Sequence, residues 1–219
     1  MTNSNITPPD ALLLLTSQCP HCPTVLQGLG ELVKKGLIGR LEAINIMARP
    51  DLAEQYGVRS VPWIRIGDFE LEGLHSPAEL KQWAERAGSV EGVADYYSDL
   101  LKHGQLPKAL ASIEKHPDHF TALLSLAENP DTELTIRIGV SAVVEDHAGS
   151  DLVMAHLPAF IEMSRHQDPR VRSDACHFLA LTRSEAALAP LRRLLKDSER
   201  AVQDVARDSL EELDEHLDP

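Results

Sequence analysis

The sequence predicts an α/β unit at the amino end, followed by an all-α unit of helical repeats. Near the amino end, two short apolar runs flank a stretch in which apolar residues recur every three or four positions, typical of a strand, a helix and a second strand. After Ser89 no strand-like alternation returns, and amphipathic segments follow one another at short intervals. Two of these segments also resemble each other at an offset of 31 residues, which favours a helical-repeat solenoid.

The α/β unit reads as β-α-β-α-β-β-α. The predicted elements are a buried strand at 11–16, a helix at 20–37, a strand at 41–47, a short helix at 50–56, strands at 63–66 and 69–71, and a helix at 77–86. Gly67-Asp68 is a hairpin turn signal between the two later strands. Ser76, Pro77 and Glu79 form the start signal of the last helix. The first half predicts a parallel crossover, and the second half a hairpin with a closing helix.

The repeat unit is predicted as a series of helices. They span roughly 91–102, 107–115, 118–128, 133–145, 152–164, 169–182, 185–195 and 199–213. The stretch from Val171 (VRSDACHFL) aligns with the stretch from Val202 (VQDVARDSL), and a weaker echo begins at Ile136 (IRIGVSAVV). The expected organisation is a flexible tail at 1–10, the α/β domain at 11–88 and the repeat domain at 89–219.

The acidity of the chain belongs to its second part. Residues 1–89 carry 8 Lys/Arg and 10 Asp/Glu, whereas residues 90–219 carry 13 and 24. This charge would repel a phosphate backbone, so nucleic acid is not expected as a partner. Two readings stay open for the acidic part: a solvated helical surface, or a surface for a basic protein partner.

The composition favours a cytoplasmic protein. The first ten residues lack the basic region of a secretory signal, and no apolar stretch approaches the ~20 residues that span a membrane. Three cysteines in 219 residues do not form a disulfide framework, so the thiols are expected to face a reducing pool.

The main chemical candidate is the segment from Ser17 to Pro23, S-Q-C-P-H-C-P. Cys19 at a helix N-terminus would meet unpaired N–H groups and the positive end of the helix dipole, which favour its thiolate. We expect Pro20 at the first helical position and Cys22 one turn in, so that a small disulfide ring can close. A protonated His21 would stabilise the thiolate further and make the pair more oxidising, unless His21 is only an exposed spacer.

A metal site is the competing interpretation of the two cysteines. Zinc commonly takes four ligands, and the remaining candidates are Cys176 and the His116–His119 pair, far along the chain. We therefore favour redox chemistry and expect no metal. Cys176 lies on a predicted inner helix face, where a buried inert thiol is expected and a third redox thiol is the alternative.

The segment Ala11–Gly88 resembles the thioredoxin superfamily. A C-P-H-C motif opens a helix directly after a strand, and S-V-P-W begins the next sheet segment, with Pro62 43 residues after Cys19. The segment looks closest to the units of protein disulfide oxidoreductases and to the amino-terminal domain of the alkyl hydroperoxide reductase flavoprotein. The last part of the chain resembles HEAT repeats, best at D-P-R-V-R-S-D-A.

The resemblance implies a role for each motif residue. Cys19 would attack, Cys22 would resolve the mixed disulfide, and Pro62 would be cis, with Val61 presenting backbone groups to a substrate strand. A simple strand-entry proline is the alternative for Pro62. Thioredoxin keeps a buried carboxylate six residues before its first cysteine, and here Leu13 takes that place, so an acceptor for the Cys22 proton must come from elsewhere.

Two functions follow from the sequence. The first is a thiol–disulfide oxidoreductase that acts on a protein disulfide, with the repeats docking a protein partner. The alternative is a redox-sensing or non-catalytic adaptor whose repeats carry the main function. No flavin or nicotinamide motif is present, so no cofactor is expected beyond the Cys19–Cys22 disulfide, and electrons would come from a thiol or a flavoprotein donor. The sequence leaves the direction of the reaction open.

Overall fold

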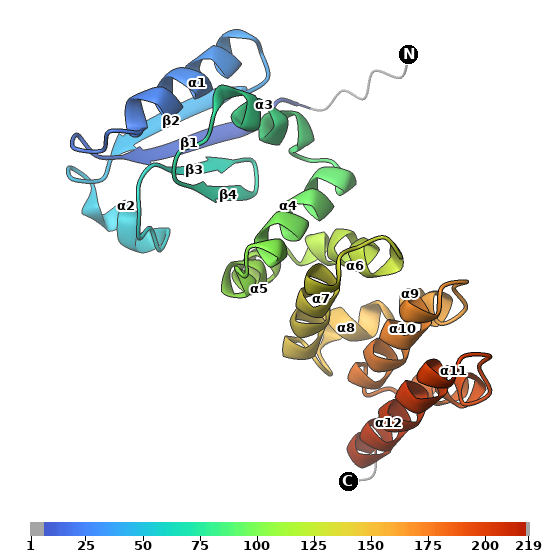
Figure 1. Ribbon diagram of the computed structural model, residues 1–219. Helices are drawn as coiled ribbons and strands as arrows, with labels where there is room; N and C mark the ends of the chain where they lie inside the picture. The colour runs from blue at the N-terminus through green and yellow to red at the C-terminus, as the bar shows by residue number, and fades with distance from the viewer. Residues whose placement is uncertain (1–6, 218–219) are drawn as a thin grey trace. The chain divides into compact units, whose positions relative to one another are not determined.

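The computed structural model describes residues 7–217. The chain divides into two compact units, residues 1–93 and 94–219. The first is an α/β unit and the second is all helix, as the sequence predicts (Figure 1). The predicted tail at 1–10 falls mostly on residues 1–6, which lie outside the described residues, and the first strand begins at Asp10.

The first unit is a four-stranded sheet in the order β2-β1-β3-β4. The strands are β1 (Asp10–Leu15), β2 (Arg40–Asn45), β3 (Trp63–Ile66) and β4 (Phe69–Glu72). β1 pairs parallel to β2 across the helix α1 (Cys22–Lys34), and antiparallel to β3, which continues into β4 as a hairpin. The turn of this hairpin contains Gly67 at φ +57°, a conformation that glycine adopts without steric cost.

Both faces of β1 are buried, which explains its continuous apolar run. Leu14 is paired with Trp63 on one face, where the ring of Tyr56 stacks on Trp63 at 5.3 Å, just after α2 (Pro50–Gln55). On the other face Leu13 is paired with Ile64, and both side chains are fully buried. The sheet thus fixes the carboxyl end of β1, from which the dithiol loop departs (Figure 1).

Helix α3 (Pro77–Arg86) starts where the sequence predicts. The Ser76 hydroxyl accepts a hydrogen bond from the Glu79 N–H, and the Glu79 carboxylate accepts one from the Ser76 N–H at 2.7 Å. These bonds satisfy two of the groups that a helix start leaves unpaired. α3 packs against α1, where a Cβ placed on Gly28 would lie 3.0 Å from the Leu80 side chain.

The second unit is a stack of helices. Its members are α4 (Val90–Lys102, which spans the division between the units), α5 (Leu106–Lys115), α6 (Phe120–Glu128), α7 (Leu134–Asp146), α8 (Asp151–Ala155), α9 (Leu157–Met163), α10 (Pro169–Leu181), α11 (Leu188–Leu194) and α12 (Arg200–Leu217). The helices α5, α7, α10 and α12 contact one another in turn, while α6, α9 and α11 each pack beside the following member of that row (Figure 1).

The predicted helical repeat is observed. Val171 of α10 and Val202 of α12, equivalent at the offset of 31 residues, are both completely buried, as are Ala175 and Ala206. Ion pairs also join neighbouring segments of the stack. Arg172 makes two hydrogen bonds of 2.8 Å to the carboxylate of Asp197, and Arg137 of α7 pairs with Asp174 of α10.

Several helix boundaries in the second unit differ from the prediction, and the last helix, α12, runs to Leu217 rather than to about residue 213. The segment 152–164 is two helices, separated at His156, because Pro158 lacks an N–H and cannot continue a helix from the preceding turn. The segments at 118 and 185 begin with single 3₁₀ turns, Pro117–His119 and Glu185–Ala187, before α6 and α11.

Candidate active site

The dithiol lies in the loop between β1 and α1. Cys22 is the first residue of α1 and its side chain is buried, whereas Cys19 sits in the loop and is half-buried. This departs from the sequence-based prediction, which started the helix at Pro20. The N-cap is His21, and Pro23, rather than Pro20, takes the early helical position where the missing N–H of a proline costs nothing.

The sulfur of Cys19 is held by backbone groups from two segments. The Cys22 N–H donates to Cys19 Sγ at 3.2 Å, and Cys19 Sγ lies 3.6 Å from the Val61 carbonyl oxygen. The Val61–Pro62 peptide bond is cis, as the resemblance implied, and Pro62 is buried. The structure therefore brings Cys19, Cys22 and Val61 together, although they are up to 42 residues apart.

The two thiols differ in acidity. Partial burial opposes ionisation of Cys19, but hydrogen bonds from the Cys22 thiol and from the N–H groups of His21 and Cys22 outweigh it, so the pKa of Cys19 is lowered. Burial and the interaction with Cys19 raise the pKa of Cys22 to about 11. Cys19 is therefore the more acidic thiol of the pair, and Cys22 stays protonated at neutral pH.

The side chains of Pro20 and His21 are exposed, and His21 makes no capping hydrogen bond through its ring. The stabilisation that the thiolate receives in this geometry comes from N–H groups and the Cys22 thiol. A tuning role for His21 stays a prediction.

Asn45 is a site residue that the sequence analysis missed. Its side-chain NH₂ donates to the Ser17 hydroxyl at 2.9 Å, and its side-chain oxygen accepts the Met47 N–H at 2.9 Å. Asn45 thus ties the end of β2 to the loop two residues before Cys19. The position of Asn45 at the end of the second predicted strand could have indicated this contact, because neighbouring parallel strands end at the same edge of the sheet. In the structure Asn45 pairs with Leu15, the last residue of β1.

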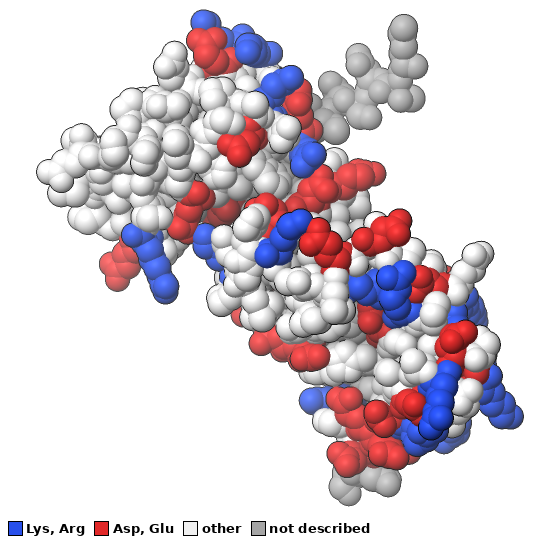
Figure 2. Space-filling view, in the orientation of Figure 1, with Lys and Arg blue, Asp and Glu red and all other residues white. Residues whose placement is uncertain are grey.

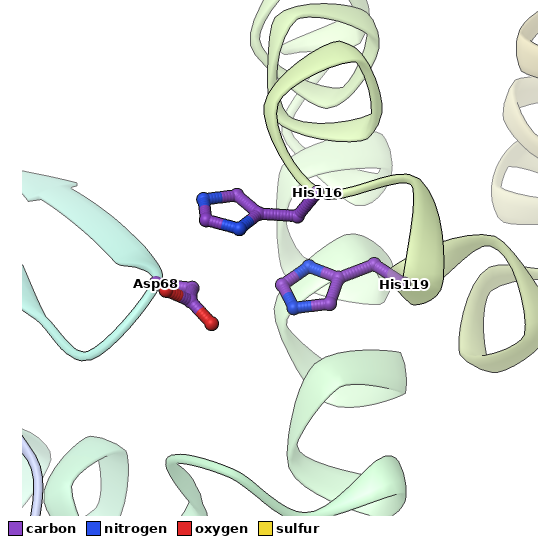
Figure 3. Close-up of side chains that lie close together, drawn as sticks. All are labelled: Asp68, His116 and His119. Carbon is purple, nitrogen blue, oxygen red and sulfur yellow. The ribbon is translucent and has the colours of Figure 1, made fainter.

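The other candidate residues from the sequence are His116, His119 and Cys176. His116 and His119 stack with ring centroids 5.0 Å apart (Figure 3), and the hydroxyl of Tyr97 lies 3.3 Å from Nδ1 of the buried His119. Asp68, drawn in the same figure, belongs to the other unit. Burial raises the pKa of Cys176 to about 12, which gives an unreactive protonated thiol at neutral pH.

Comparison with known proteins agrees with this geometry. A family model for a thioredoxin domain matches residues 11–85, and a model for HEAT repeats matches residues 149–211. A thioredoxin of Methanocaldococcus jannaschii is 34% identical over 70 residues, which are 31% of this chain and 82% of that protein.

A strand, a dithiol loop, a helix and a cis proline beside the sulfur define a thiol–disulfide oxidoreductase type of protein. Through its first unit, the chain belongs to the thioredoxin family, and a HEAT-repeat region follows. Within residues 7–217, no helix combines the length and the apolar character needed to cross a membrane.

Proposed function

We propose that this chain exchanges electrons with protein disulfides through Cys19 and Cys22, and that its helical unit docks a protein partner. The observation that carries the proposal is the contrast between the two thiols. Cys19 is half-buried and has a lowered pKa, whereas Cys22, the first residue of the helix, is buried and has a pKa of about 11. This asymmetry suits a nucleophile followed by a resolving thiol.

In the reducing direction, the Cys19 thiolate attacks one sulfur of the substrate disulfide. A Cys19–substrate S–S bond forms while the substrate S–S bond breaks, and the released substrate sulfur leaves as a thiolate that takes up a proton. Cys22 then loses its proton and attacks Cys19 Sγ, which releases the second substrate thiolate. The substrate gains two electrons from the two thiols, one proton from Cys22 and one proton from solvent, and the chain is left with a Cys19–Cys22 disulfide.

The first step prepares the second. In the mixed disulfide Cys19 carries no charge, so its hydrogen bond and its electrostatic repulsion no longer raise the pKa of Cys22. Burial alone still opposes ionisation of Cys22. The fully buried Leu13 supplies no carboxylate that would accept the proton, so the released substrate thiolate is the base that we assign to this step.

Insulin reduction with dithiothreitol tests this proposal. We expect Cys19→Ser to remove the activity. Cys22→Ser, first reduced and then incubated with insulin after the dithiothreitol is removed, should accumulate a mixed disulfide that is visible by mass spectrometry. Cys176→Ser is the control, because that thiol is buried in the helical unit and should leave the rate unchanged. Wild-type activity in the Cys19→Ser variant would refute the proposal and favour an adaptor function.

A further inference from the structure

A groove lies between α7 and α10 in the helical unit. Its volume is about 340 Å³. α7 lines it with the apolar residues Leu134, Ile138 and Ala142 and, near its carboxyl end, with Glu145. α10 contributes Asp174 and His177. It does not involve the dithiol, and the proposed chemistry gives it no role.

Two of the apolar residues of the groove are exposed to an unusual degree. Leu134 and Ile138 are 72% and 60% exposed, and they stand one helical turn apart on α7. Single exposed aliphatic residues are common, but these two lie next to each other on one helix and both line the groove, where they form a small apolar patch. Such a pair offers a place for one branched or long apolar side chain.

The charges in the groove favour a cationic ligand. Arg137 reaches inward, where it donates to the carbonyl oxygens of Ala127 at 3.1 Å and Asn129 at 3.2 Å and pairs with Asp174. Its charge is therefore already compensated. Glu145 keeps an exposed carboxylate, with one oxygen 2.8 Å from the ring of His177.

The same face continues onto α12 and becomes more acidic. At the offset of 31 residues, His177 is equivalent to Asp208, and Ser173 to Asp204. Asp208 and Glu211 are exposed, while Asp204 is shared between Arg200 and Arg207. Figure 2 shows Asp and Glu side chains at the α12 end of the chain, with Lys and Arg side chains beside them. This face of the helical unit therefore carries exposed aliphatic residues at α7 and exposed acidic residues at α12.

We propose that the α7–α10 groove binds a basic segment of a partner protein. An apolar side chain of that segment inserts between Leu134 and Ile138, and its Lys or Arg residues face Glu145 and the acidic surface at Asp208. Complementary charge speeds and orients the encounter, while the buried apolar side chain supplies most of the affinity. The inference rests on the proposal that the helical unit docks a protein, but it does not depend on the dithiol chemistry.

Selection of peptides tests this inference. The immobilised full chain is the target and a phage-displayed library of random peptides is the probe. We expect the enriched peptides to combine Lys or Arg with Leu, Ile, Val or Met, and a synthetic copy to bind in fluorescence anisotropy. Ile138→Asp should weaken binding by at least about tenfold, the loss typical of a central interface residue. Asp208→Lys should weaken it by about three- to tenfold, and added salt should weaken wild-type binding.

The control variant is Met154→Asp, which replaces another exposed apolar residue, 47% exposed, outside the groove and should change binding by less than about twofold. Circular dichroism verifies that each variant is folded. Enriched peptides that are acidic, or that bind Ile138→Asp as well as the wild type, would overturn the inference, as would a library with no enrichment. Insulin reduction by the same variants should stay at the wild-type rate, so a failure of docking is distinguishable from a failure of the redox proposal.

Discussion

Replacing Cys22 by Ala should make Cys19 a weaker acid. In the reduced protein the Cys22 thiol donates a hydrogen bond to Cys19 and helps to lower its pKa. A hydrogen bond to a charged group contributes about 1.5–3 kcal/mol, and one pKa unit corresponds to about 1.4 kcal/mol. Because Cys19 is only half-buried, solvent screens the interaction, and we expect an effect at the lower end of this range, which raises the pKa of Cys19 in the variant.

The assay is the pH dependence of iodoacetamide alkylation at Cys19, followed by mass spectrometry of the peptide that carries it. Cys22→Ser is the matched variant, because its hydroxyl can still donate and should leave most of the pKa shift in place. Cys176 does not interfere, since it is buried and protonated. An alkylation midpoint in Cys22→Ala equal to that of the wild type would refute the role of the Cys22 thiol, as would equal shifts in the Ala and Ser variants.

Three further predictions concern stability and positioning. The hydrogen bonds from Arg172 lower the pKa of Asp197, so the stability that this carboxylate contributes is present above its ordinary pKa of 3.8 and is lost as the pH falls through its lower value in the folded protein. Asp197→Asn should therefore destabilise the helical unit by about 3 kcal/mol at pH 7. In urea unfolding measured at a series of pH values, the variant should lose less stability on acidification than the wild type. Gly30→Ala should stabilise the chain by up to about 1 kcal/mol, because no atom lies near the added Cβ. Gly28→Ala, on the same helix but facing α3, should bring no such gain. Equal increases in the thermal unfolding temperature of both variants would contradict this prediction. Asn45→Ala should slow insulin reduction about threefold or more, because the dithiol loop loses its hydrogen bond to β2. Asn45→Asp keeps an acceptor for the Met47 N–H and should slow the reaction less. Unchanged rates in both variants would show that the Asn45–Ser17 hydrogen bond does not position the loop.

Local chemical signals predicted much of this fold from the sequence. The capping box at Ser76 and Glu79 and the turn at Gly67 depend on neighbouring residues alone, and both appear where the sequence places them. The buried strand β1 followed from its apolar run, and the repeat from the alignment of α10 with α12.

Features that depend on contacts between distant segments were harder to predict. The C-P-H-C-P motif offers two prolines, and only the folded loop shows that Pro23, not Pro20, takes the early helical position. The Asn45–Ser17 hydrogen bond joins two segments that are 28 residues apart, and the α7–α10 groove is lined by residues from two helices tens of residues apart. No local pattern marks such pairs before the sheet and the helix stack bring them together.

The reduction potential of the Cys19–Cys22 pair tests the central claim most directly. The full chain is equilibrated in glutathione buffers, and the disulfide is quantified after acid quenching and thiol labelling. The account predicts a reversible intramolecular disulfide with a potential between about −270 and −120 mV, the range of thioredoxin-like dithiols. If no Cys19–Cys22 disulfide forms at any glutathione ratio while the chain remains folded, thiol–disulfide exchange is not the function of this site.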